Sequence, residues 1–133
     1  MATTNAFNHI AFNCIDIARQ EAFYAKHLGF KRCRTFNRGK PDEFFLMKLG
    51  SVRLEFFSSK TVDVKGGEQT IGFKHLAFDV PKLEPVIEGL KADGASVDEI
   101  KELSHVSPGL RIVFFRDPEG NIVELMEGYV DEE

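Results

Sequence analysis

The sequence predicts an α+β protein in which two βαβββ modules form a curved, mixed and antiparallel sheet around a cleft. Three observations predict this fold class: a strand motif occurs twice, each copy precedes a helical pattern that ends in glycine, and strand-like segments follow each helix. With 133 residues, the chain is long enough to bury one core without disulfide bonds. We expect a single domain over residues 1–133, with module one at about 6–58, a linker at about 59–72 and module two at about 73–128.

The repeat begins with a strand led by histidine. Residues 9–13, His-Ile-Ala-Phe-Asn, recur as His-Leu-Ala-Phe-Asp at 75–79, an offset of 66. A helical pattern follows each copy and is closed by Gly29 or Gly94. Glycine is favoured just beyond a helix end because it adopts φ > 0 without steric cost. The apolar positions that set the two helical patterns are Ile17, Tyr24 and Leu28 in the first copy and Leu83, Val86, Ile87 and Leu90 in the second.

Three strand-like segments follow each helix. Tight turns precede the last strand of each copy, at Gly50-Ser51 and at residues 117–120, Asp-Pro-Glu-Gly. Proline pre-sets φ at the second turn position, and glycine suits the fourth. The predicted strands are 30–36, 43–49 and 52–57 in module one, and 96–100, 110–115 and 121–126 in module two.

Composition excludes several classes of function. The net charge of −4 disfavours a nucleic-acid partner, because phosphate binding needs a cationic surface. No apolar run approaches the ~20 residues of a membrane span, and residues 1–5 do not form a secretory signal. Cys14 and Cys33 are too few for a disulfide scaffold. We expect a cytoplasmic protein with reduced thiols, no nucleic-acid partner and no membrane contact.

Four ionisable residues lie at predicted strand positions where apolar residues are expected. His9 and His75 begin matching strands and lie on the face opposite the large apolar residues, because strand side chains alternate. Glu55 and Glu124 each lie between two apolar residues of a last strand. Burying a lone carboxylate costs several kcal/mol unless a cation or hydrogen bonds compensate. Alone, each residue is more commonly structural or solvated.

The joint pattern predicts a shared metal ion. The interval from histidine to glutamate is 46 residues in copy one and 49 in copy two, with ligand-type residues at every corresponding point. Imidazole and carboxylate ligands suit a divalent Ni, Zn, Mn, Co or Fe ion. The sequence therefore predicts one such ion, held by His9, Glu55, His75 and Glu124.

The same motifs show a family resemblance that covers nearly the whole chain. In order and spacing, the chain resembles the vicinal oxygen chelate superfamily, which includes glyoxalase I, extradiol dioxygenases and fosfomycin- and bleomycin-resistance proteins. The fold of that family is paired βαβββ modules. Its bacterial glyoxalase I branch uses a His, Glu, His, Glu ligand set, which matches the four residues above. The segments that carry the resemblance are 9–12, 23–24, 28–30, 52–57, 74–80 and 115–125.

The resemblance implies a glyoxalase I-like lyase or isomerase that moves a proton next to a carbonyl of a small substrate with vicinal oxygens. Glu124 is the expected base, and Glu55 would return a proton to the neighbouring carbon. Glyoxalase I has an arginine where this chain has Asn13, which lacks the charge to pair with a glutathione carboxylate. The substrate and any role of glutathione therefore stay open.

Three further residues are weaker candidates, and two other functions compete. Arg53 shares a strand face with Glu55 and, like Asn13 and His105, is a candidate substrate contact. His27 suits a helix C-terminus, and Asp117 suits a turn. An Fe(II) dioxygenase is disfavoured because a fourth protein ligand would occupy a needed position. A non-catalytic small-molecule or antibiotic binder is disfavoured because such relatives usually lack these ligands. We expect a homodimer, because two modules alone leave sheet edges to cover.

Overall fold

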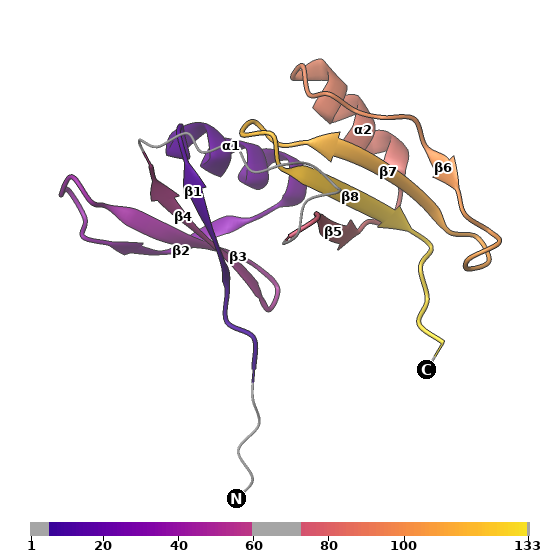
Figure 1. The fold of residues 1–133 in the computed structure, drawn as a ribbon, viewed down its shortest axis with the longest axis horizontal. Helices are drawn as coiled ribbons and strands as arrows, with labels where there is room; N and C mark the ends of the chain where they lie inside the picture. The colour runs from indigo at the N-terminus through magenta and orange to yellow at the C-terminus, as the bar shows by residue number, and fades with distance from the viewer. Residues whose placement is uncertain (1–5, 60–72, 133) are drawn as a thin grey trace, which may run out of the picture. The chain divides into compact units, whose positions relative to one another are not determined.

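The computed structural model describes residues 6–59 and 73–132, which form two compact units, one within Met1–Asp63 and the other within Val64–Glu133. Each unit has the predicted βαβββ order, and each sheet is mixed and four-stranded (Figure 1). The α+β fold class is therefore confirmed. Most of the predicted linker, residues 60–72, lies outside the described residues.

The first unit contains one helix and a sheet in the order β1-β4-β3-β2. The first strand runs parallel to β4, and the other neighbours are antiparallel. Each predicted strand of this half is confirmed to within one residue at its ends. The elements are β1 (Ile10–Cys14), α1 (Ile17–Leu28), β2 (Lys31–Phe36), β3 (Phe44–Leu49) and β4 (Val52–Ser58).

Local sequence determines both ends of α1. The carboxylate of Asp16 accepts a hydrogen bond from the backbone N–H of Arg19 at 3.0 Å, which satisfies one of the free donors at the helix N-terminus. At the other end Gly29 has φ 82°, and its N–H donates to the carbonyl of Ala25. The predicted closure of this helix by glycine is confirmed.

Alternation along the strands divides the first sheet into two faces. On one face the side chains are buried against α1, as the 5.6 Å contact between the rings of Tyr24 and Phe56 shows. The opposite face is only half-buried, and we call it the open face of the first unit. The buried strand residues are Phe45, Met47, Leu54 and Phe56, whereas Phe44, Leu46, Arg53, Glu55 and Phe57 lie on the open face.

The second unit repeats this plan with a sheet in the order β5-β8-β7-β6. The strand β5 is parallel to β8, and α2 packs against β7 and β8 (Figure 1). Its core is formed mainly by apolar residues of α2, β7 and β8. The elements are β5 (Leu76–Asp79), α2 (Leu83–Ala92), β6 (Lys101–Glu102), β7 (Arg111–Arg116) and β8 (Ile122–Glu127).

The N-terminus of α2 is capped from a distant strand. Lys82, at the cap position, makes no side-chain cap bond. Instead, the carboxylate of Glu127 accepts a hydrogen bond from the backbone N–H of Leu83 at 2.9 Å. Arg111 donates to the same carboxylate at 3.1 Å and also pairs with Glu84 on the helix. These contacts tie α2 to β7 and β8.

The strand predicted at residues 96–100 is wrong. In that segment only Val97 forms a bridge, to Phe115, and the regular ladder begins at Lys101, opposite Ile112. From 97 to 101 is four steps, whereas from 115 to 112 is three, so one extra residue is inserted opposite β7. Such a bulge interrupts the ladder and leaves β6 only two residues long.

The turn between β7 and β8 is confirmed, and so is the structural role of Asp117. Its carboxylate accepts hydrogen bonds from the backbone N–H groups of Glu119 and Asn121, both at 2.9 Å, and from the Asn121 amide at 2.8 Å. Gly120 has φ 90°, as the turn requires. Among the described residues, no helix is long and apolar enough to cross a membrane.

Candidate metal centre

The first unit brings His9 and Glu55 together at one point of its open face. Glu55 lies on β4 beside Ala11 of the parallel strand β1, and the small alanine side chain leaves room for the imidazole. His9 precedes β1, and its Nε2 atom lies 3.1 Å from Oε1 of Glu55. The side chains are 36% and 12% exposed, so the carboxylate is the more enclosed partner.

The neighbouring residue Asn8 orients the imidazole of His9. The Nδ1 atom of His9 lies 2.8 Å from the Asn8 Oδ1, which is an acceptor only. In the neutral ring, the proton therefore lies on Nδ1, and Nε2 presents a lone pair to the carboxylate of Glu55. Two acceptors at 3.1 Å repel unless a metal ion or a proton lies between them. This arrangement suits a metal ligand.

The second unit repeats the pair with His75 and Glu124. Glu124 lies opposite Ala77 in the β5–β8 register, as Glu55 lies opposite Ala11. The Nε2 atom of His75 is again 3.1 Å from a glutamate Oε1, and the side chains are 24% and 11% exposed. The two units therefore hold their His–Glu pairs at the same distance and from the same register.

The surroundings of His75 differ from those of His9. The His75 ring packs edge-on against Phe114, with centroids 5.4 Å apart and planes at 73°. Its Nδ1 atom is buried and has no hydrogen-bond partner among the described residues. A buried, unsatisfied polar atom costs about 1–3 kcal/mol. The sequence gives this histidine no partner equivalent to Asn8, because Lys74 precedes it.

Each pair fits two adjacent ligands of one ion. Donor atoms bound at about 2.1 Å and at right angles lie about 3.0 Å apart, close to the observed 3.1 Å. In the ranges 6–59 and 73–132, no cluster of three or more His, Cys, Asp or Glu side chains occurs. Each unit therefore supplies two donors, and a single four-ligand centre built from both pairs stays a prediction.

The remaining predicted site residues differ in their surroundings. Asn13 is exposed on β1, two residues beyond Ala11, and Arg53 is half-buried on the same face as Glu55. Both therefore lie near the first pair. His105 is exposed in a turn before β7 and forms no hydrogen bond or ion pair with the other described residues. His27 lies in the last turn of α1, with its ring 4.8 Å from that of Phe23.

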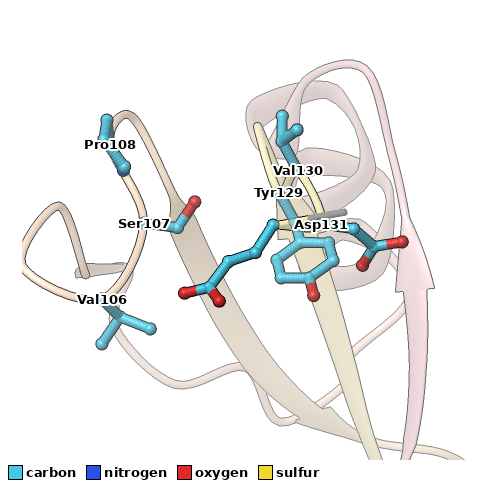
Figure 2. Close-up of a pocket in the computed structure, with 7 residues that line it drawn as sticks. Val106, Ser107, Pro108, Tyr129, Val130 and Asp131 are labelled. Atoms are coloured by element: carbon cyan, nitrogen blue, oxygen red, sulfur yellow. The ribbon is translucent and has the colours of Figure 1, made fainter.

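The second unit has a hollow with a volume of about 580 Å³. It lies between the loop before β7 and the segment after β8, as Figure 2 shows. None of the four predicted ligands lines it. The hydrogen bond from Tyr129 to Asp131 raises the pKa of the tyrosine hydroxyl. The residues that line the hollow are Val106, Ser107, Pro108, Tyr129, Val130, Asp131 and Glu132.

The absence of a side chain at Gly128 allows these two segments to approach each other closely. Gly128 has φ 83°, and a Cβ atom there would lie 2.6 Å from the carbonyl oxygen of Gly109. A side chain at this position would therefore push the C-terminal segment away from the loop.

Comparisons with known proteins agree with the fold. The profile of the Glyoxalase/Bleomycin resistance protein/Dioxygenase superfamily matches residues 6–125. The uncharacterised protein YwkD of Bacillus subtilis is 30% identical over 125 residues, which cover 92% of this chain and 96% of YwkD. A crystal structure of a glyoxalase family protein from Enterococcus faecalis is 32% identical, with a TM-score of 0.75, and covers 92% of this chain and 97% of that one.

A more distant structure shares the fold alone. It is a mutant of the fosfomycin resistance protein FosX of Listeria monocytogenes, solved with Mn(II) and a dihydroxypropylphosphonic acid. It is 14% identical, with a TM-score of 0.75 and 96% of each chain covered. Together, the profile match over most of the chain and the identity to YwkD establish the family. The chain belongs to the Glyoxalase/Bleomycin resistance protein/Dioxygenase superfamily.

Proposed function

We propose that this protein is a divalent-metal-dependent, glyoxalase I-like lyase or isomerase acting on a small substrate with vicinal oxygens. The observation that carries the proposal is the repeated pair, His9 with Glu55 and His75 with Glu124, each at 3.1 Å and each in the same sheet register. Two imidazoles and two carboxylates suit Ni, Zn, Mn, Co or Fe and leave two octahedral positions for substrate oxygens.

Two observations support metal binding. The Asn8 Oδ1 atom accepts from Nδ1 of His9 and leaves Nε2 facing Glu55, where a metal ion can be shared between the imidazole and the carboxylate. In addition, FosX, which shares the fold, was solved with Mn(II). When bound, the ion would act as a Lewis acid that stabilises negative charge on the substrate oxygens.

In this proposal the glutamates move the proton. Glu124 is buried and lies opposite Phe114 in the β7–β8 register, so water has little access to its carboxylate. A shielded carboxylate in this position can remove a proton from the carbon next to the substrate carbonyl. Glu55 lies on the half-buried face of the other unit and would return a proton to the neighbouring carbon.

The proposed role of Glu124 is tested by the substitution Glu124→Gln. Proton exchange would be followed as solvent-deuterium incorporation into α-ketoaldehydes and their thiol hemithioacetals, with several added metals. We expect Glu124→Gln to lose at least about 100-fold in rate, while retaining part of its metal affinity. The matched control is Glu88→Gln on the exposed face of α2. Normal exchange by the Glu124→Gln protein would show that another group is the base.

A second part of the proposal concerns the thiol that carries the substrate. Asn13 can donate or accept a hydrogen bond but cannot form the charged pair that an arginine makes with a glutathione carboxylate. We therefore expect thiols other than glutathione, or no thiol, to support turnover.

We also expect a homodimer, which light scattering of the purified chain would check. A monomer at micromolar concentration would contradict the expected assembly.

A further inference from the structure

The open face of the first unit is organised in three rows that cross its strands. The row of Glu55 contains Ala11 on β1 and Leu46 on β3, its partners in the sheet register. Aromatic residues form the row on one side of it, and cationic residues form the row on the other. Because alternate residues share a face, adjacent rows are about 7 Å apart along the strands.

The aromatic row contains Phe57, Phe44 and Phe36 on β4, β3 and β2. The rings of Phe44 and Phe57 stack with centroids 4.4 Å apart and planes at 22°, and those of Phe36 and Phe44 with centroids 4.6 Å apart and planes at 10°. Rings stacked along a row direct their edges away from the sheet. Aromatic edges carry partial positive charge and attract the face of another aromatic ring.

The cationic row contains Arg53, Lys48 and Lys31, which are neighbours in register on β4, β3 and β2. Like charges directly opposite each other on adjacent strands are destabilising. Within residues 6–59, no carboxylate forms an ion pair with any of the three. In a chain of net charge −4, this uncompensated row favours an anionic ligand.

Arg34 places a positive charge beside the aromatic row. It lies on β2 in the same row as Glu55 and Leu46, and its guanidinium stands 4.9 Å from the centroid of the Phe36 ring. This cation–π contact keeps a positive charge beside the aromatic row. The cationic row therefore lies on one side of the row of Glu55, and the aromatic row, with Arg34 beside Phe36, lies on the other.

We infer that the substrate is a small carboxylate that bears an oxygen on the adjacent carbon and an aromatic substituent. This inference rests on the proposed function, because the vicinal oxygens would be held beside Glu55. The aromatic group would lie across the edges of Phe57 and Phe44. The carboxylate would face Arg53, the half-buried member of the cationic row.

Three stable probes separate these requirements. Mandelate has vicinal oxygens, a ring and a charge. Lactate replaces the ring by a methyl group, and 1-phenyl-1,2-ethanediol lacks the charge. Binding of each to the full chain would be measured by calorimetry, with and without Mn²⁺. With Mn²⁺, we expect mandelate to bind about tenfold more tightly than either of the others, since one aromatic contact or one charged pair is worth about that factor.

Two single variants, one in the aromatic row and one in the cationic row, test the two contacts separately. Phe44→Leu should weaken mandelate about tenfold and leave lactate unchanged, because only mandelate has a ring. Arg53→Gln should weaken mandelate and lactate but leave the diol unchanged. Lys91→Gln, on the exposed face of α2, is the matched control and should alter none of them.

The outcomes separate this inference from the proposed function. If Mn²⁺ tightens all three probes but mandelate has no advantage, the inference about the substrate is overturned and the metal centre stands. If mandelate is preferred and Mn²⁺ has no effect, the rows recognise the ligand and the proposed metal function fails. If Phe44→Leu weakens lactate as much as mandelate, the aromatic row is structural and the inference is wrong.

Discussion

The two halves of the molecule have the same βαβββ plan and the same His–Glu pair, but they differ around that pair. In the first unit, the histidine is oriented by Asn8 and is 36% exposed. In the second unit, His75 is 24% exposed, packs against Phe114 and has a buried Nδ1 without a partner among the described residues. The two His–Glu pairs therefore share one geometry, whereas the groups around them differ.

The faces next to the two pairs differ as well. In the first unit, the row on one side of Glu55 contains three phenylalanines and Asn13, and the row on the other side is cationic. In the second unit, the position equivalent to Phe57 is Met126, and Asp79 replaces Asn13. The two faces therefore differ beside the pairs, although the carboxylates of Glu55 and Glu124 are equally enclosed, at 12% and 11% exposure.

The largest expected effect comes from removing a ligand from either half. His75→Ala and His9→Ala should each weaken metal binding by more than about 100-fold, the upper range for losing an outer-sphere partner. Competition with a chromogenic chelator would measure both affinities. If one variant binds metal normally, the two pairs do not share an ion. His105→Ala, in an exposed turn, is the control and should bind metal as the unmodified chain does.

A smaller effect is expected from removing the hydrogen bond between Asn8 and His9, which has no counterpart at His75 among the described residues. Asn8→Ala should weaken metal binding about tenfold, because the imidazole of His9 loses its orienting partner. The nitrogen chemical shift of the His9 Nδ1 atom in the metal-free chain should report a hydrogen bond to Asn8 in the parent and the loss of that bond in the variant. Asn13→Ala is the matched control. An unchanged Nδ1 shift would show that Asn8 does not orient the ring.

The helix caps provide a third comparison, in stability rather than binding. α1 is capped locally by Asp16, and Asp16→Ala should destabilise the chain by about 1 kcal/mol. Urea unfolding followed by circular dichroism would measure the loss. Asp98→Ala, at an exposed position before β6 where the described residues offer the side chain no hydrogen bond, is the matched control. A loss as small as that of the control would indicate that the cap contributes little.

The smallest effect is expected at the long-range cap of α2 and depends on pH. Hydrogen bonding to the backbone of Leu83, and then pairing with Arg111, lowers the pKa of Glu127 below its ordinary 4.5. A lowered pKa adds stability above the unfolded value and loses it as the pH falls through the folded value. Glu127→Gln should therefore lower the melting temperature at pH 7 and match the parent well below pH 4.5. Glu88→Gln is the control. An equal deficit at every pH would contradict an electrostatic cap.

Much of the fold follows from local sequence signals. The glycine after α1, the alternation along β4 and the Asp-Pro-Glu-Gly turn all act over a few residues, and each was predicted correctly. The His–Glu pairs were found because the repeat aligned two weak signals. The bulge that displaced the predicted strand 96–100 depends on pairing with β7, and no residue within the segment specifies it.

Features that depend on distant pairing were not predicted. The cap of Leu83 by Glu127 joins residues 44 positions apart, and the row formed by Phe36, Phe44 and Phe57 depends on the register of three strands. Asn8 could have been identified, because it is adjacent to a proposed ligand and carries a suitable acceptor. Its role became clear only from the direction of the imidazole.

The most direct test of the shared centre is the number of metal ions bound per chain. The metal-free full-length chain would be titrated with Mn²⁺ by calorimetry, and bound metal would be counted by mass spectrometry after gel filtration. A shared centre predicts one ion per chain, lost both in the His9→Ala, Glu55→Gln double variant and in the His75→Ala, Glu124→Gln double variant. Two ions per chain, each lost with only one pair, or no bound ion at all, would contradict it.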